Sequence, residues 1–236
     1  TDALMFRESA RFYDAQYGFK DYAGEADVLV TIVTEEVPEA RTWLDVACGT
    51  GKHLSFLTTR FDVQGVDLNP VLLDAARARL PEVTFHTADM RSFDLGVRFD
   101  VVSCLFSAIG SLESVEDLHA AARAFAHHLK PRGLVVVEPW LLPDAFRPGT
   151  LHHLTVDEPD LKISRMCLSG LDGRSSVIDF FFQVATPDGI EQFVEPHRLT
   201  LFTREEYLDA FAAAGLAVRW IEGGLTGRGL VIGQAP

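Results

Sequence analysis

Features that define several protein classes are missing from this chain of 236 residues. Its cysteines, Cys48, Cys104 and Cys167, are odd in number and far apart, so neither a disulfide framework nor a metal-binding spacing is visible. This usage is typical of a reducing cytoplasm, and we expect no metal. The sequence also shows no secretory signal peptide and no apolar run long enough to span a bilayer, so a membrane partner is not expected.

Basic residues are scarce as well. Lys and Arg together number 21 against 34 for Asp and Glu, which gives a net charge of -13, and no basic run is present. A polyanion would be repelled over most of such a surface, so nucleic acid is not an expected partner. A local basic pocket could still hold a small phosphorylated substrate.

Strand-like and helix-like patterns alternate along the chain. Hydrophobic residues make up 47% and charged residues 23%, an ordinary balance for one sizeable globular domain. Such alternation predicts an α/β fold with a mostly parallel, doubly wound sheet and a ligand at the carboxyl ends of its strands. Strands are expected over residues 42–46, 63–66, 83–85, 99–105, 134–138, 217–221 and 229–233, and helices over 4–16, 26–36, 54–57, 70–80, 114–129 and 203–215.

Residues 139–201 follow a different pattern. Alternating apolar and polar residues are separated by turn signals at Asp172-Gly173 and Asp188-Gly189, which predicts antiparallel hairpins. We interpret this stretch as an insertion and not as an independent domain. Residues 1–236 are thus expected to form one domain, divided into an N-terminal helical segment (1–40), a core (41–138), the insertion (139–201) and a C-terminal part (202–236).

The stretch 44–51, with the sequence LDVACGTG, carries the strongest functional signal. It is a buried strand that ends in a carboxylate, followed by a tight glycine loop, and the next strand ends in Asp67. An acidic residue about 20 positions after a glycine loop is the spacing at which a Rossmann-type site holds a ribose diol. A dinucleotide site needs a third glycine where Leu54 stands, so an adenosine-bearing cofactor without a pyrophosphate is favoured over NAD(P).

The order of these motifs resembles class I S-adenosylmethionine (SAM) methyltransferases. The pattern from Asp45 to Gly51 is similar to their motif I, Asp67-Leu68 to the site for the ribose hydroxyls and one adenine face, and Ala88-Asp89-Met90 to the site for the adenine amine. The resemblance implies a Rossmann-like class I methyltransferase fold with a seven-stranded sheet, and SAM as cofactor. The residues that it implies around SAM are Tyr13, Tyr22, Asp45, Ala47, Gly49, Gly51, Asp67, Leu68, Asp89, Met90 and Leu105.

Over nearly its full length, the chain resembles the N,N-dimethyltransferases that act on nucleotide-linked amino sugars, as in desosamine and mycaminose biosynthesis. The resemblance implies an antiparallel insertion that forms the acceptor site, an N-terminal helical lid, and a role in antibiotic biosynthesis. It implies a small-molecule acceptor such as a TDP-sugar, and a homodimer is an open expectation. Matching stretches include residues 20–22, 106–110, 135–140, 198–205 and 223–230. The residues implied around the sugar are Trp140, Leu141, Leu142, Arg165 and Arg228, with the two arginines meeting its phosphates.

The acceptor half departs from that family at two positions. Ser111 stands where a histidine can lie near the acceptor amine, and Met5 or Phe6 stands where a tyrosine is expected. An amine needs only to arrive unprotonated, whereas a hydroxyl needs a base more urgently. Ser111 therefore fits an amine or carbon acceptor slightly better, unless another base has taken over.

Glu138, His197 and Ser111 are the candidate catalytic residues. Glu138 could orient an amine or cap the following segment, and His197 could face the acceptor or be a hydrogen-bonded strand histidine. Three other functions stay open: an O- or C-methyltransferase acting on another natural product, an NAD(P)-linked reductase, and a non-catalytic SAM-binding protein.

Overall fold

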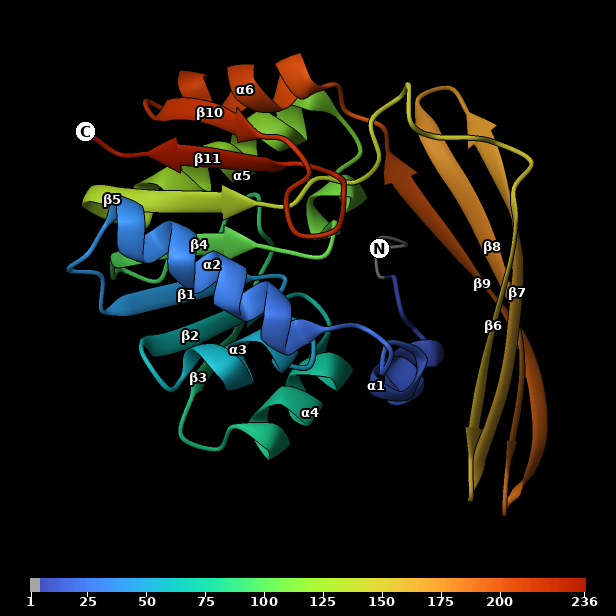
Figure 1. Cartoon of the computed structure of the whole chain (residues 1–236). Coiled ribbons are helices and arrows are strands. Elements are labelled where there is room, and N and C mark those ends of the chain that lie inside the picture. The colour runs from blue at the N-terminus through green and yellow to red at the C-terminus, as the bar shows by residue number, and fades with distance from the viewer. Residues whose placement is uncertain (1–4) are drawn as a thin grey trace.

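The computed structural model describes residues 5–236 and contains two sheets, shown in Figure 1. The main sheet has seven strands in the order β10-β11-β5-β4-β1-β2-β3. Strands β3, β2, β1, β4 and β5 run parallel to one another, and β11 is antiparallel to both β5 and β10. The predicted mostly parallel, seven-stranded sheet is therefore confirmed. Its strands are β1 Thr42–Val46, β2 Asp62–Asp67, β3 Thr84–Thr87, β4 Phe99–Cys104, β5 Leu129–Val137, β10 Ala217–Ile221 and β11 Leu230–Gln234.

Helices cover both faces of the main sheet. The main sheet separates two buried hydrophobic clusters, and alternate residues of strand β5 contribute to each. Leu134 and Val136 pack in one cluster, and Val135 and Val137 pack in the other. A strand that is buried on both faces reads as a continuous apolar run, which is typical of parallel sheets. One cluster contains α2 (Tyr22–Glu36), α3 (Lys52–Leu57) and α4 (Pro70–Arg79), and the other contains α5 (Val115–His127) and α6 (Arg204–Ala213). Among the described residues, no helix is long and apolar enough to cross a membrane.

Polar caps begin three of these helices as the sequence predicts. The Asn69 side chain accepts from the amide of Val71 at 3.0 Å, and Pro70 stands at the first position of α4. Ser114 accepts from the amide of Asp117 at 3.1 Å at the start of α5. A reciprocal capping box, in which Thr203 and Glu206 cap each other's amides, starts α6.

Two predictions for the N-terminal part are wrong. The helix expected over 4–16 is a 3-10 turn, η1 (Ser9–Phe12), followed by a single α-helical turn, α1 (Tyr13–Gln16), and Leu4 lies outside the described residues. The helix expected from residue 26 begins at Tyr22, so Gly24 lies in the first turn of α2, where its amide donates to Asp21 Oδ1 at 2.9 Å. A Cβ on Gly24 would lie 2.4 Å from that carboxylate. The glycine therefore permits a helix cap and does not end a segment.

Strand β5 begins earlier than predicted, at Leu129, and α5 ends at His127. Leu129 pairs with Phe99, and the register then shifts between Phe99 and Val101. Arg132 adopts a left-handed φ of 63° within the strand. The residues Pro131-Arg132-Gly133 are thus an irregularity inside β5, and their turn-like composition conceals the first part of the strand.

The insertion forms a four-stranded antiparallel sheet in the order β6-β7-β8-β9, as predicted. In Figure 1 it stands beside the carboxyl ends of the main-sheet strands, with α1 and the residues before it in between. It packs there through two small hydrophobic clusters. Phe182 and Phe12 belong to one of them, and Leu199 and Trp140 belong to the other. Its strands are β6 Leu151–Glu158, β7 Leu161–Asp172, β8 Ser175–Thr186 and β9 Gly189–Thr200, and the remaining short helix, η2, spans Ala108–Ser111.

Candidate active site

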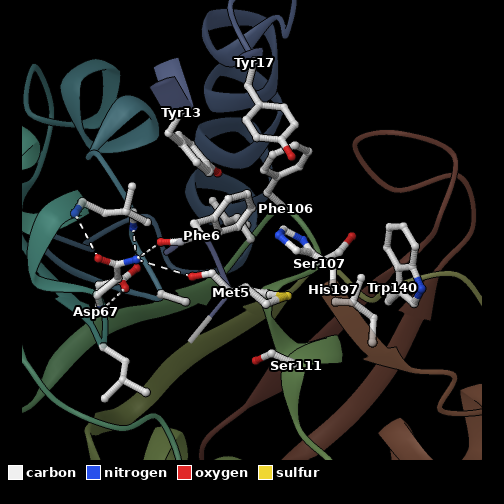
Figure 2. Close-up of a pocket in the computed structure, with 18 of the residues that line it drawn as sticks. Met5, Phe6, Tyr13, Tyr17, Asp67, Phe106, Ser107, Ser111, Trp140 and His197 are labelled. Carbon is white, nitrogen blue, oxygen red and sulfur yellow. Dashed lines mark hydrogen bonds between the residues drawn. The ribbon is translucent and has the colours of Figure 1, made fainter. Parts of the chain in front are cut away.

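A pocket of about 710 Å³ lies between the carboxyl edge of the main sheet, the N-terminal residues and the insertion sheet. This volume is within the range of small-molecule sites. Figure 2 shows side chains from all three parts pointing toward one another. The sequence-predicted residues that line it are Tyr13, Ala47, Gly49, Asp67, Leu68, Asp89, Met90, Leu105, Ser111, Trp140, Arg165, His197 and Arg228. The sequence-predicted residues outside its lining are Tyr22, Asp45, Gly51, Glu138, Leu141 and Leu142.

The glycine loop after β1 is bent by left-handed residues. Ala47, Gly49 and Gly51 have φ values of 57°, 55° and 71°. For alanine this conformation is strained, so the surrounding contacts must hold it. The bend brings the amide of Gly49 to Asp67 Oδ2 at 2.8 Å, which joins the ends of β1 and β2.

Asp67 is the carboxylate at the end of β2, and it is buried. Its Oδ1 also accepts from the amide of Asn69 at 2.8 Å. Burial raises the pKa of Asp67, and the hydrogen bonds from the Asn69 and Gly49 amides oppose that rise. The carboxylate is thus held in place by backbone donors at the edge where Figure 2 places it.

Asp89 follows β3 and is engaged by an arginine that the sequence did not suggest. Arg91 Nε lies 3.0 Å from Asp89 Oδ1 and 3.1 Å from Oδ2, and its Nη1 reaches Asp117 at 3.2 Å. The hydrogen bonds from Arg91 lower the pKa of Asp89, against the effect of burial. Arg91 therefore keeps Asp89 ionised and fixes its orientation in the pocket wall.

Asp45, Gly51 and Tyr22 support the loop from outside the pocket. Asp45 accepts from Ser103 Oγ at 2.6 Å between β1 and β4, and burial raises its pKa to about 6. Gly51 is the N-cap of α3, and the ring of Tyr22 packs edge-on against His53 at 4.9 Å. Their role around the cofactor stays a prediction.

A buried ion pair lines the pocket near the ends of β1 and β4. Lys20 Nζ is bonded to Glu25 Oε1, and Glu25 Oε2 lies 2.9 Å from His53 Nε2. Lys20 also lies 4.5 Å from the ring centre of Phe106, which follows β4. In the sequence, residues 20–22 stand out as a shared motif, but the family resemblance gives a role to Tyr22 alone. The partners of Lys20 come from α2 and from the loop after β4, so no local pattern reveals them.

Phe6 occupies the centre of the pocket view in Figure 2, between Asp67 and His197. Its ring packs edge-on against Tyr13 at 4.9 Å and His197 at 4.7 Å. Its carbonyl accepts from Asn69 Nδ2 at 2.7 Å. Phe6, one of the two residues at which the tyrosine was expected, therefore connects the main-sheet side of the pocket to the insertion side.

Two arginines form the polar part of the acceptor half. Arg228 bonds to Ser107 Oγ and lies 4.8 Å from the ring centre of Trp140, and burial lowers its pKa. Arg165 donates to Gln16 Oε1 at 3.0 Å and lies 4.4 Å from the ring centre of Phe180. Aromatic faces thus hold both guanidinium groups at the pocket wall.

His197 and Glu138 have different surroundings. His197 lines the pocket, and its Nε2 lies 2.8 Å from Glu195 Oε1. Glu138 is fully buried and accepts from the amide of Phe106 at 2.7 Å and from the hydroxyl of Thr226. Both carboxylate oxygens of Glu138 are therefore engaged, and this residue fixes the loop after β4 from outside the pocket. Leu142, also outside it, packs against the core.

Comparison with known proteins identifies similar chains. A family model described as a methyltransferase domain matches residues 44–133. The dTDP-3-amino-3,6-dideoxy-α-D-glucopyranose N,N-dimethyltransferase of Streptomyces fradiae is 45% identical over 230 residues, covering 96% of this chain and 90% of that protein.

Two solved structures share the fold over nearly the full length. The crystal structure of Streptomyces venezuelae DesVI superposes with a TM-score of 0.92 at 42% identity, covering 98% of this chain and 99% of that one. SAM-bound CalS10, an amino pentose methyltransferase from Micromonospora echinaspora involved in calicheamicin biosynthesis, superposes with a TM-score of 0.87 at 40% identity, covering 99% of this chain and 98% of that one. These matches support the interpretation of the glycine loop that favours SAM over NAD(P).

Proposed function

We propose that this chain, which belongs to the family of SAM-dependent methyltransferases, methylates the amine of a nucleotide-linked amino sugar. Methyl transfer and SAM as cofactor follow from the family, and the acceptor is the proposal. The Streptomyces fradiae relative is named for a dTDP-linked amino sugar, and the Micromonospora relative for an amino pentose. Antibiotic biosynthesis is accordingly the setting that we propose.

The edge of the main sheet fits SAM. A carboxylate offers about four lone-pair sites, so the hydrogen bonds from the Gly49 and Asn69 amides to Asp67 leave acceptor capacity for a ribose hydroxyl. The left-handed loop at Ala47 and Gly49 lets the backbone approach a ligand closely. SAM, when bound, supplies the electrophilic methyl group.

The position of two arginines in the pocket is the main support for the proposed acceptor. Arg165 and Arg228 line the same pocket as Asp67 in a chain with a net charge of -13. A diphosphate would otherwise be repelled, so a dedicated pair of guanidinium groups is what its binding requires. Their positions on β7 and in the loop before β11 would hold the phosphates on the acceptor side.

The chain contributes mainly positioning to the reaction. In-line transfer requires the acceptor nitrogen to lie within reach of the methyl with its lone pair free, so orientation supplies most of the acceleration. The acceptor wall is the side of the pocket that includes Trp140, Arg165, His197 and Arg228. On it, His197, held by Glu195, is a side chain that could receive the proton of the amine. Ser111 lines the pocket without a group that can serve as a base near neutral pH.

One experiment tests this function directly. The protein is incubated with isotopically labelled SAM and a panel of dTDP-sugars that carry an amine at different ring positions, with matched hydroxyl sugars in parallel. Mass spectrometry should find one or two labelled methyl groups on an amino sugar, and none on its hydroxyl counterpart. Transfer to the hydroxyl sugars, and to none of the amino sugars, would contradict the proposal.

An O-methyltransferase is the second candidate, and the Glu195–His197 pair favours it. A histidine that a carboxylate orients is the arrangement expected of a general base, which a hydroxyl acceptor needs more than an amine does. The hydroxyl sugars in the same panel decide between the two functions.

A cytoplasmic location remains a prediction from the three free cysteines.

We also propose that the enzyme is a homodimer, with a second copy on the outer face of the insertion sheet. Met166, Phe181 and Val194 pair across β7, β8 and β9 and are 55%, 53% and 52% exposed. Such a contiguous apolar row is unusual on a monomer surface, and a two-fold contact would cover the same row on both copies. Light scattering should give twice the monomer mass, and Phe181→Asp should give the monomer. A wild-type monomer at micromolar concentration would contradict this assembly.

A further inference from the structure

Glu195, on strand β9, collects five hydrogen-bond donors around one carboxylate. Its Oε2 lies 3.0 Å from each of the backbone amides of Arg7, Glu8 and Ser9. Its Oε1 accepts from Ser9 Oγ at 2.6 Å and lies 2.8 Å from His197 Nε2. Residues 7–9 are more than 180 positions away in the chain, so this carboxylate joins the N-terminal residues to the acceptor wall.

The surroundings keep this carboxylate charged. Glu195 is 4% exposed, and burial alone would raise its pKa, but the hydrogen bonds from His197 and Ser9 lower the pKa to about 2. An ionised carboxylate only accepts hydrogen bonds, so His197 Nε2 must carry the shared proton. In the neutral ring this leaves Nδ1 as the nitrogen that can accept a proton.

Residues 5–17, called the strap below, lie across the pocket and are held from both sides. On the side of the main sheet, Asn69 Nδ2 donates to the Phe6 carbonyl at 2.7 Å, and Thr50 donates to Asp14 Oδ1 at 2.7 Å. On the side of the insertion sheet, Glu195 binds the strap through Oε2 and Ser9. Because the strap lines the pocket through Met5, Phe6, Tyr13 and Tyr17, opening of these contacts would widen the access to a ligand beneath it.

We infer that Glu195 is a positioning residue that holds the strap closed and, with the same carboxylate, sets the orientation and tautomer of His197. Closure of the strap over the cofactor is thereby coupled to the arrangement of the acceptor wall. When the strap leaves, Ser9 no longer shares Oε1 with the imidazole, and Phe6 no longer packs on its ring. The strap and tautomer claims rest on contacts of this chain alone, and only their part in methyl transfer rests on the proposed function.

The test compares Glu195→Gln with Glu191→Gln. Glutamine keeps the volume of glutamate but replaces one acceptor oxygen by a donor, so either the strap amides or the Ser9–His197 side must face an NH₂ group. Glu191 lies on the same strand and accepts from Arg11 of the same strap at 2.7 Å, but that ion pair is exposed. An exposed pair contributes little, so Glu191→Gln should behave as wild type.

Hydrogen exchange of the full chain measures how well the backbone amides of the strap are protected. It is recorded with and without S-adenosylhomocysteine, the demethylated form of the cofactor. In wild type, residues 5–17 should gain protection with this ligand. In Glu195→Gln, their exchange should be roughly tenfold faster or more, the size expected for losing a hydrogen bond to a charged group. The dissociation rate of the ligand should rise in parallel. Exchange equal to wild type would overturn the role of Glu195 in the strap.

Nitrogen-15 spectra of labelled histidine report the tautomer of the imidazole ring. Neither this measurement nor hydrogen exchange needs an acceptor substrate. His197, assigned by its absence in His197→Asn, should show the Nε2–H tautomer in wild type and Glu191→Gln, and a mixture in Glu195→Gln. An unchanged tautomer in Glu195→Gln would overturn the second half of the inference. Ser9→Ala, which removes one hydroxyl and keeps the carboxylate, should loosen the strap in the same direction by a smaller factor, and it decides the strap question if Glu195→Gln does not fold.

Discussion

The two walls of the pocket are built in different ways. The wall that we propose for the cofactor, called the cofactor wall, consists of strand ends and backbone amides, with Asp67 held by the amides of Gly49 and Asn69. The acceptor wall consists of side chains that hold one another, with Arg228 on Trp140 and Arg165 on Phe180. A wall made of backbone groups changes little when side chains change, whereas a wall of mutually packed side chains can be altered one residue at a time. Cofactor binding should therefore be the more constant property of this fold, and acceptor choice the more variable one.

The largest expected effect concerns the acceptor wall alone. Ser111 lines the pocket at the position where the family resemblance implies that a histidine can lie near the acceptor amine. Turnover on dTDP-3-amino-3,6-dideoxy-α-D-glucopyranose, the sugar that the Streptomyces fradiae relative is named for, should therefore be weak. We expect a rate at least about 100-fold below that on the chain's own acceptor, since about 1 Å of misplacement can cost that much. Steady-state assays with labelled SAM measure it. Ordinary turnover on this sugar would show that Ser111 is a neutral replacement.

The next effect concerns the cofactor wall. Asp67→Ala should weaken SAM binding tenfold or more, because a hydrogen bond to a charged group contributes about 1.5–3 kcal/mol. Calorimetry gives the affinity. Asp62→Asn is the matched control, since Asp62 begins the same strand at its other end and is exposed. An affinity of Asp67→Ala equal to that of the control would remove Asp67 from the cofactor wall.

A carboxylate far from both walls should affect stability only. Asp100 accepts from the Arg41 amide at 3.0 Å, the Thr42 amide at 2.9 Å and Lys130 Nζ at 3.0 Å. Burial alone would raise its pKa, but these hydrogen bonds lower it to about 2. Since the pKa is about 3.9 in the unfolded chain, the stabilisation is complete above that value and is lost as the pH falls through about 2.

Asp100→Asn should therefore lower the free energy of unfolding by about 2 kcal/mol at pH 7 and flatten its fall in acid. Urea unfolding at several pH values measures both quantities. SAM affinity at pH 7 should equal that of wild type, because Asp100 lies at the end of β4 opposite the pocket. A change in SAM affinity would mean that the two walls are less separate than the structure indicates.

The smallest expected effect concerns the two arginines of the pocket, whose substitution should change acceptor binding but not cofactor binding. Arg165→Lys and Arg228→Lys keep the charge but lose the planar fork that matches a phosphate. We expect the KM for a nucleotide-sugar to rise about threefold to tenfold with SAM affinity unchanged. Arg204→Lys is the control, because Arg204 also lies over an indole, 5.2 Å from the ring centre of Trp220, but outside the pocket. Unchanged KM values in both pocket variants would argue for an acceptor without phosphate.

The sequence predicted the cofactor wall better than the acceptor wall for a physical reason. The glycine loop, Asp67 and Asp89 each follow a strand directly, and parallel strands bring such positions to one edge wherever the fold forms. The alternation of strands with helices and the antiparallel insertion could be predicted from the same local patterns, but the order of the strands in the sheet was not predicted. Resemblance to a family, and not spacing, pointed to Arg165 and Arg228.

Some contacts escaped prediction because they join distant parts of the chain, and others because they contradict the usual preference of a residue type. Glu195 meets residues 7–9 across more than 180 positions, and no local pattern marks either partner. Lys20 and Glu25 are buried as a pair, although each alone is typical of a solvated surface. Gly24 and Gly133 both resembled breaks in sequence, yet one lies in a helix cap and the other inside a strand. The Gly24 cap is a local contact with Asp21, whereas Gly133 is held by a tertiary contact, because its carbonyl accepts from the Ala235 amide at 2.9 Å.

The insertion sheet leaves the core after β5 and returns before α6, so one uninterrupted stretch of the coding sequence specifies most of the acceptor wall. Recombination at two points could therefore transplant this wall between related enzymes without disturbing the SAM site. The Glu195 contact sets a condition on such exchanges, because the incoming β9 must present a carboxylate to the recipient's strap. Chimeras that carry the insertion and residues 5–17 from the same parent should therefore be active more often than those that mix them.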